Sequence, residues 1–295
     1  IMKNRMGLWG RLALLTTPVI WGSSFVILKN AIDGLGVMWV LAMRFTISAA
    51  LLLALAGKRL RSMSRASVRG SVLIGVCLAA AYIVQTYGLK YTTPGKNAFL
   101  TTTYCVMVPF LAWLVYKRKP GLHNVAAAVL CVAGIGFVAL DAGFGEVNTG
   151  DVLTIFSGVF YALQIILMEQ YISGCDSLSV SAVEFSTAAV ICLVGTFAFE
   201  GTPVIPASGQ IFAVLYLAVM CTALCFFLQA WGMKYTPSST AAMIMTLEAV
   251  FGTIFSVILY HEQVTPRLLA GFALIFVAVV LSETGTELLK KLRKQ

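Results

Sequence analysis

Apolar residues along the chain come in runs of roughly 18–23, separated by short polar segments. Runs of this length can cross the roughly 30 Å of hydrocarbon in a bilayer as α-helices. The pattern predicts ten membrane-spanning helices, over residues 11–31, 36–56, 70–90, 97–116, 122–140, 151–170, 179–199, 209–231, 238–260 and 266–286. We therefore expect an all-α integral membrane protein without a soluble domain.

One short segment occurs twice along the chain. Gln85-Thr-Tyr-Gly-Leu-Lys-Tyr-Thr92 recurs as Gln229-Ala-Trp-Gly-Met-Lys-Tyr-Thr236, with Gln, Gly, Lys, Tyr and Thr identical. The same offset pairs Tyr104 with Glu248. The chain is thus predicted to consist of two repeats of five helices each, residues 1–145 and 146–295.

The odd number of helices in each repeat predicts the relative orientation of the two halves. A second copy of five helices must enter the membrane from the opposite side, so the repeat is inverted. Inverted repeats allow two related packings of one core, open to one side or the other, which is the geometric basis of alternating access.

Composition and charge agree with a membrane protein. Of the 295 residues 59% are hydrophobic and 11% are charged, against about 25% charged residues in soluble domains. The formal charge of +9 gathers in the N-terminal segment, the 58–69 loop, residues 117–119 and the C-terminal tail. These segments share one side of a ten-helix protein, so the positive-inside rule predicts both termini in the cytoplasm, in the inner (plasma) membrane. The bilayer is the expected partner, and no basic soluble module suggests nucleic acid.

Metal, cofactor and enzymatic chemistry find little support in the sequence. The seven cysteines show no zinc-ligand spacing, and Cys221 and Cys225 have no histidine near them. The two histidines, His123 and His261, fall at the ends of spans far apart in sequence, which does not suit a nucleophile–base pair. We expect no metal, no cofactor and no catalytic residues.

Polar and aromatic residues follow one face of six predicted spans, and the stripes match between the two repeats. A polar group in hydrocarbon costs free energy unless it faces a partner or water. We therefore expect these stripes to surround a central substrate cavity; the alternative is that they only form hydrogen bonds between helices. The candidate substrate-binding residues are Trp21, Ser24, Tyr82, Gln85, Asn97, Thr101, Tyr104, Tyr161, Gln164, Gln229, Met245 and Glu248.

Four charged residues inside predicted spans are candidates for coupling or gating. Glu248 falls near the middle of its span, where it could carry a proton, balance a substrate amine, or fix helix packing as a neutral acid. Arg44 and Glu184 occupy symmetric positions and could line the two mouths of a pathway. Lys29 could do the same or extend its ammonium to the interface.

The sequence resembles the drug/metabolite transporter superfamily, in particular its ten-helix EamA family. The resemblance covers nearly the whole chain and rests on Trp21-Gly-Ser-Ser-Phe25, Arg44-Phe45, Gly88-Leu-Lys-Tyr-Thr-Thr-Pro94, Leu247-Glu248 and His261-Glu262. It implies an inner-membrane carrier, often an exporter of amino acids or related metabolites, with its cavity between the halves. Ala249 stands where the family usually has proline, so the substrate does not transfer with the fold.

The sequence accordingly favours a secondary transporter for a small zwitterionic or amine-like metabolite, with protons as the candidate coupling ion. Glu248 supplies negative charge, and Trp21, Tyr82, Tyr104 and Tyr161 supply aromatic faces suited to amines. A carrier of an anionic sugar or nucleotide, through Arg44 and Lys29, is the alternative, and a channel is less favoured because channels usually have oligomeric symmetry around a continuous pore.

Overall fold

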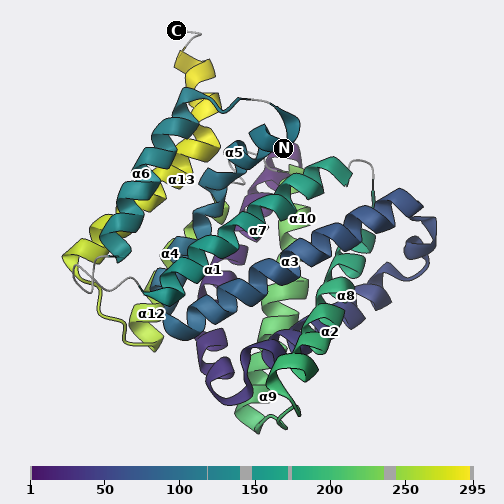
Figure 1. The fold of residues 1–295 in the computed structure, drawn as a ribbon. Coiled ribbons are helices and arrows are strands. Elements are labelled where there is room, and N and C mark those ends of the chain that lie inside the picture. Colours follow the sequence, from purple (N-terminus) through teal and green to yellow (C-terminus); the bar gives the residue numbers. More distant parts are fainter. Residues whose placement is uncertain (1, 118, 140–147, 172–174, 236–243, 293–295) are drawn as a thin grey trace.

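The structure is a computed structural model that describes residues 2–117, 119–139, 148–171, 175–235 and 244–292. These residues form helices joined by short connections, and the described part of the chain contains no strand (Figure 1). In chain order the elements are α1 Met2–Leu35, α2 Val37–Ala56, η1 Gly57–Ser62, α3 Arg65–Tyr91, α4 Pro94–Thr102, α5 Tyr104–Tyr116, α6 Leu122–Ala139, α7 Thr149–Tyr171, α8 Ser177–Gly195, η2 Thr196–Glu200, α9 Ser208–Leu215, η3 Tyr216–Leu224, α10 Cys225–Tyr235, α12 Leu247–Leu259 and α13 Pro266–Leu292.

These helices match the spans expected from the hydrophobic pattern. In the described residues, seven helical stretches are long and apolar enough to cross a membrane, and three shorter apolar helices occupy the fifth, ninth and tenth predicted spans. The first part of the ninth span, residues 238–243, lies outside the described residues. Val129 and Val132 on the outer face of α6 are 65% and 69% exposed, as suits side chains that meet lipid. The all-α membrane fold predicted from the sequence is confirmed.

Several helix starts follow directly from local sequence. Ser64 precedes α3, and its hydroxyl accepts a hydrogen bond from Ser67 N. Asp176 does the same for α8 by accepting from Ser179 N. Thr93 and Pro94 open α4, since proline fits the first turn of a helix and lacks the N–H that would be unpaired there. Such caps set where each span begins.

The two halves of the chain run in opposite directions. Helix α2 of the first half packs along α8 of the second: Phe45 stacks on Phe185 with ring centroids 5.9 Å apart, and Gly195 lies against Met38. Numbering therefore rises along α2 as it falls along α8. Equivalent helices of the two repeats are thus antiparallel, as an inverted repeat requires.

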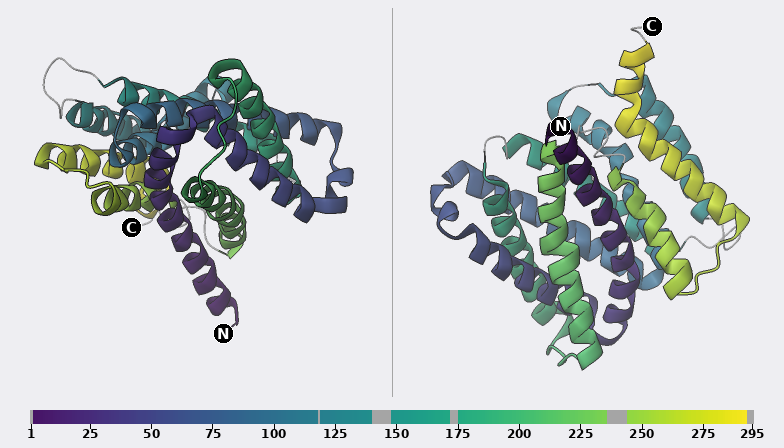
Figure 2. Two further views of the ribbon diagram at one scale, coloured as in Figure 1. Left: turned by 90° about the horizontal axis from the view of Figure 1, so that it is seen from below. Right: turned by 180° about the vertical axis from the view of Figure 1, so that it is seen from behind.

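A contact between the halves has a counterpart in which each helix is replaced by the equivalent helix of the other half. The third helix of the first half, α3, packs along α7, the first helix of the second half. Its mate α10 packs along α1 in the same way. This exchange is the signature of a pseudo-twofold axis between the repeats. Figure 1 shows α3 beside α7, and the rear view in Figure 2 shows α1 beside α10.

The crossing of α6 and α13, which lie side by side in Figure 1, depends on glycine. A Cβ added to Gly134 would lie 2.7 Å from Ile275 Cγ1 and 2.9 Å from Gly271 O, whereas one added to Gly136 meets nothing within 4 Å. Both glycines lie in α6, so alanine raises helix propensity equally at the two positions.

We expect Gly134→Ala to lower the free energy of unfolding by about 1–3 kcal/mol through overpacking. The matched Gly136→Ala variant should be neutral or stabilised by up to about 1 kcal/mol. Denaturant unfolding of the purified protein in detergent measures both. Equal stabilities for the two variants would show that the α6–α13 crossing does not depend on this close approach.

Candidate functional site

Arg44 lies in α2 with 2% of its surface exposed. Its Nε donates a hydrogen bond of 3.0 Å to Thr222 Oγ1 on η3, and its guanidinium carbon lies 4.9 Å from the centroid of the Tyr82 ring. The remaining guanidinium N–H groups have no hydrogen-bond partner among the described residues. A buried guanidinium with open donors suits an oxyanion, because its planar fork matches a carboxylate.

Glu248 is the second residue of α12 and is partly buried. Within the described part of the chain its carboxylate makes no hydrogen bond and no ion pair. It lies within electrostatic range of Arg44, Tyr82 and Tyr161. One cation from the first half and one carboxylate from the second therefore lie within electrostatic range of each other, and they form no salt bridge in the described part of the chain.

Three tyrosine rings pack together beside Arg44. The rings of Tyr82 and Tyr161 meet edge to face with centroids 5.6 Å apart, and Tyr104 packs on Tyr161 at 5.8 Å. Aromatic faces beside charged groups favour ammonium ions. We call Arg44, Tyr82, Tyr161 and Glu248 the central cluster.

Hydrogen bonds join three further predicted residues to the central cluster. Tyr161 donates to Gln85 Oε1 at 2.7 Å, and Gln85 Nε2 donates to Thr101 Oγ1 at 2.8 Å. Asn97 Nδ2 donates to Thr154 Oγ1 at 2.7 Å, which ties α4 to α7. The structure thus brings Gln85, Asn97 and Thr101 together, largely satisfied by one another, although Asn97 Oδ1 is buried without a partner among the described residues.

A second polar contact lies one helical turn from Tyr161. Gln164, at the next turn of α7, donates from Nε2 to Glu184 Oε1 at 2.8 Å. Glu184 on α8 is completely buried. Arg44 and Glu184, which the repeat pairs by symmetry, make no ion pair with each other in the described structure.

The other predicted residues have different surroundings. Trp21 Nε1 donates to Cys221 O at 2.6 Å, and Ser24 Oγ donates to Trp21 O at 2.6 Å. Gln229 on α10 and Met245 before α12 make no hydrogen bond to a described residue. The structure therefore does not join Gln229 or Met245 to the central cluster by hydrogen bonds.

Lys29 holds a helix junction. Its Nζ donates to three backbone oxygens, Leu89 O at 2.7 Å, Lys90 O at 2.8 Å and Thr92 O at 3.1 Å. These carbonyls belong to the end of α3 and the turn that leads into α4. A cation at the carboxyl end of a helix satisfies carbonyls that lack helical partners and complements the helix dipole.

We expect Lys29→Met to lower the free energy of unfolding by about 3–5 kcal/mol, because the methionine leaves buried carbonyls without their charged donor. Yield of monodisperse protein and its melting temperature in detergent would measure the loss. Lys90→Met, an exposed lysine of the same junction, is the control and should melt like wild type. Equal melting of the two variants would show that the Lys29 contacts add little to stability.

Sequence reasoning missed two acidic residues that hold helix starts. Glu200 accepts hydrogen bonds of 2.9 and 3.0 Å from Met38 N and Trp39 N at the start of α2. Glu262 accepts from Gly95 N at 2.9 Å at the start of α4, and from the hydroxyls of Thr93 and Ser256. Along the chain, Glu200 lies 162 residues from Met38, and Glu262 lies 167 residues from Gly95. No local sequence pattern carries that pairing.

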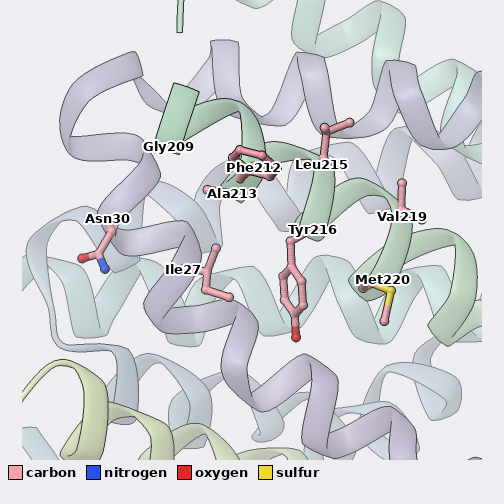
Figure 3. Close-up of a pocket in the computed structure, with 9 residues that line it drawn as sticks. All are labelled: Ile27, Asn30, Gly209, Phe212, Ala213, Leu215, Tyr216, Val219 and Met220. Carbon is pink, nitrogen blue, oxygen red and sulfur yellow. The ribbon is translucent and has the colours of Figure 1, made fainter. Parts of the chain in front are cut away.

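Two cavities lie away from the central cluster, and none of the predicted site residues lines either of them. One of about 770 Å³ is bounded by Ile27 and Asn30 of α1 and by Phe212, Tyr216 and Met220 of α9 and η3 (Figure 3). The other, of about 300 Å³, lies between α5, α6 and α7 and has an almost wholly apolar lining. Neither carries a charged group that could recognise a polar solute.

No group of three His, Cys, Asp or Glu side chains within the described residues is placed to hold a metal ion. All seven cysteines are free thiols. The chemistry that the central cluster offers is therefore ionic, hydrogen-bonding and aromatic.

These features define a multi-pass membrane protein of two inverted helical repeats, with the central cluster between them. The chain belongs to the EamA-like transporter family, whose model matches residues 8–140 and 148–284. It is 32% identical to an uncharacterized transporter of Archaeoglobus fulgidus over 275 residues, covering 93% of this chain and 85% of the relative.

More distant relatives point the same way. The chain is 21% identical to the probable terminal-alkyne amino-acid exporter of Streptantibioticus cattleyicolor, covering 97% of this chain and 96% of that protein. A solved crystal structure of a protein without a stated function superposes with a TM-score of 0.65 at 16% identity, covering 95% of this chain and 97% of the other. That likeness supports the fold alone.

Proposed function

We propose that this transporter carries a small zwitterionic metabolite of the amino-acid type through the membrane, by alternating access around the central cluster. The proposal rests on Arg44 and Glu248, which come from opposite halves, lie within electrostatic range of the same tyrosines and form no ion pair with each other in the described structure. A purely structural pair would be expected to close, because an isolated buried charge is costly.

A zwitterion carries one charged group that suits Arg44 and another that suits Glu248. Its carboxylate can accept two N–H bonds from the open fork of Arg44. Its ammonium can face the Glu248 carboxylate and the rings of Tyr82 and Tyr161. The amino-acid exporter named among the relatives supports this substrate class and outward transport.

The inverted repeat supports the mechanism. Because the central cluster draws residues from both halves, rocking one half against the other exposes it to one side of the membrane at a time. Basic loops on the side of both termini support an inner (plasma) membrane orientation with the termini in the cytoplasm. Protons are the coupling ion that we consider for the cycle.

A panel of three related ligands tests the proposal: one carries both charges, and each of the other two carries only one of them. Melting of the detergent-solubilised protein would be measured with an L-amino acid, its amide, which keeps only the ammonium, and its N-acetyl derivative, which keeps only the carboxylate. Binding to the folded state at 100 times Kd adds about 2.7 kcal/mol of stability. We expect the largest shift from the zwitterion and smaller shifts from its two singly charged derivatives; a larger shift from N-acetylated, sugar-phosphate or nucleotide ligands than from the zwitterion would favour the anionic alternative that Arg44 by itself suggests.

A further inference from the structure

Glu184 is a buried carboxyl group that the substrate site leaves unexplained. The residue has 0% of its surface exposed. Oε1 accepts the hydrogen bond from Gln164, whereas Oε2 has no partner in the described part of the chain. An ionised carboxylate with one oxygen unsatisfied in a dry interior is costly, and a neutral acid avoids most of that cost.

Within the described residues, no cation forms an ion pair with Glu184. Of the elements packed against α8, α2 brings Arg44, whose guanidinium turns to Thr222 and Tyr82. Helix α3 brings Cys77 and Tyr82. Helix α7, joined to α8 by the Gln164–Glu184 hydrogen bond, brings Tyr161, whose hydroxyl donates to Gln85 Oε1. The acid of η2, Glu200, binds the start of α2. Among the described side chains, no Lys, Arg or His lies within 4 Å of the Glu184 oxygens.

Glu248 has different surroundings. It is partly exposed and lies within electrostatic range of the Arg44 guanidinium, whose positive charge favours an ionised carboxylate. It can therefore stay ionised and serve as a pole for the substrate. Glu184 lies near the central cluster, because its partner Gln164 and Tyr161 of the cluster lie on successive turns of α7.

We propose that Glu184 is the proton-binding site of the transport cycle, neutral in the conformation described and ionised when the halves rearrange and admit water. In the step, the carboxylic O–H bond breaks, the proton passes to water, and the electron pair stays on the carboxylate. Gln164 supports both forms, since its amide N–H can donate to a carbonyl oxygen or to a carboxylate. The coupling role rests on the proposed transport function; the protonation itself does not.

Infrared spectroscopy of the protein in lipid at neutral pH tests the protonation alone. The C=O stretch of a buried carboxylic acid should appear in the wild type, disappear in Glu184→Gln and remain in Glu248→Gln. Glutamine mimics the neutral acid in size and in its acceptor for Gln164, so the variant should fold. A wild-type spectrum without this band, or a band that persists in Glu184→Gln, overturns the proposal.

Transport in proteoliposomes tests the coupling. With a mixture of ¹⁴C-labelled amino acids, an imposed pH gradient should drive accumulation by the wild type and by Asp176→Asn, an exposed carboxyl at the start of the same helix. Glu184→Gln should lose at least nine-tenths of the gradient-driven accumulation and keep exchange of label without a gradient. Accumulation that survives in Glu184→Gln overturns the coupling role. Absence of any labelled flux in the wild type contradicts the proposed function, and the infrared result still decides the proton site.

Discussion

Arg44→Gln is expected to lower substrate uptake at least about 100-fold, the largest single effect in the protein. Glutamine keeps a polar group near Thr222 but removes the charge and the planar fork. Loss of a charged partner in a buried site costs about 3–5 kcal/mol, equivalent to a factor of more than 100. Uptake of labelled amino acids into proteoliposomes, normalised to protein that elutes as a single species, measures the effect.

Two companion variants separate charge from geometry at Arg44. Arg44→Lys keeps the charge without the fork, so we expect intermediate activity. Arg59→Gln removes an arginine whose side chain is 65% exposed and should transport like wild type. Wild-type uptake by Arg44→Gln would show that the guanidinium is a structural group and not a substrate contact.

Glu248→Gln is expected to change selectivity as well as rate. The substitution keeps the shape and removes the negative pole, so uptake of a zwitterion should fall about 10- to 100-fold, as expected for loss of a charged hydrogen bond worth about 1.5–3 kcal/mol. Binding of the N-acetyl derivative, which lacks the ammonium, should not weaken. Arg44→Gln should weaken both ligands. Equal effects of the two variants on both ligands would contradict separate poles for carboxylate and ammonium.

The hydrophobic pattern was sufficient for the spans and for their inverted order. Within the described residues each apolar run is helical, because lipid leaves the backbone few alternatives to satisfying its own hydrogen bonds. The odd number of helices in each repeat then determined the direction of the second half, as the antiparallel packing of α2 on α8 shows. Helical spacing also placed Tyr161 and Gln164 on one face of α7.

The partners of the polar groups were not accessible from the sequence. Thr222, which accepts the hydrogen bond from Arg44, lies in η3, a π-helical stretch that no residue pattern predicts. The same stretch accepts the Trp21 hydrogen bond at Cys221 O and the Ser48 bond at Ala218 O. Lys29 meets carbonyls about 60 residues away, through a turn whose path depends on how α3 and α4 pack. Helix rotation and tilt decide these contacts, and one sequence does not encode them locally.

In the proposed mechanism, the two halves alternately expose one binding site to each side of the membrane. Counterflow tests it most directly: proteoliposomes loaded with excess unlabelled amino acid are diluted into trace labelled amino acid, and label is followed over time. We expect a transient, saturable accumulation of label in the wild type that is lost in Arg44→Gln. Flux that rises linearly with concentration and is not stimulated by substrate on the opposite side would contradict it and indicate a channel.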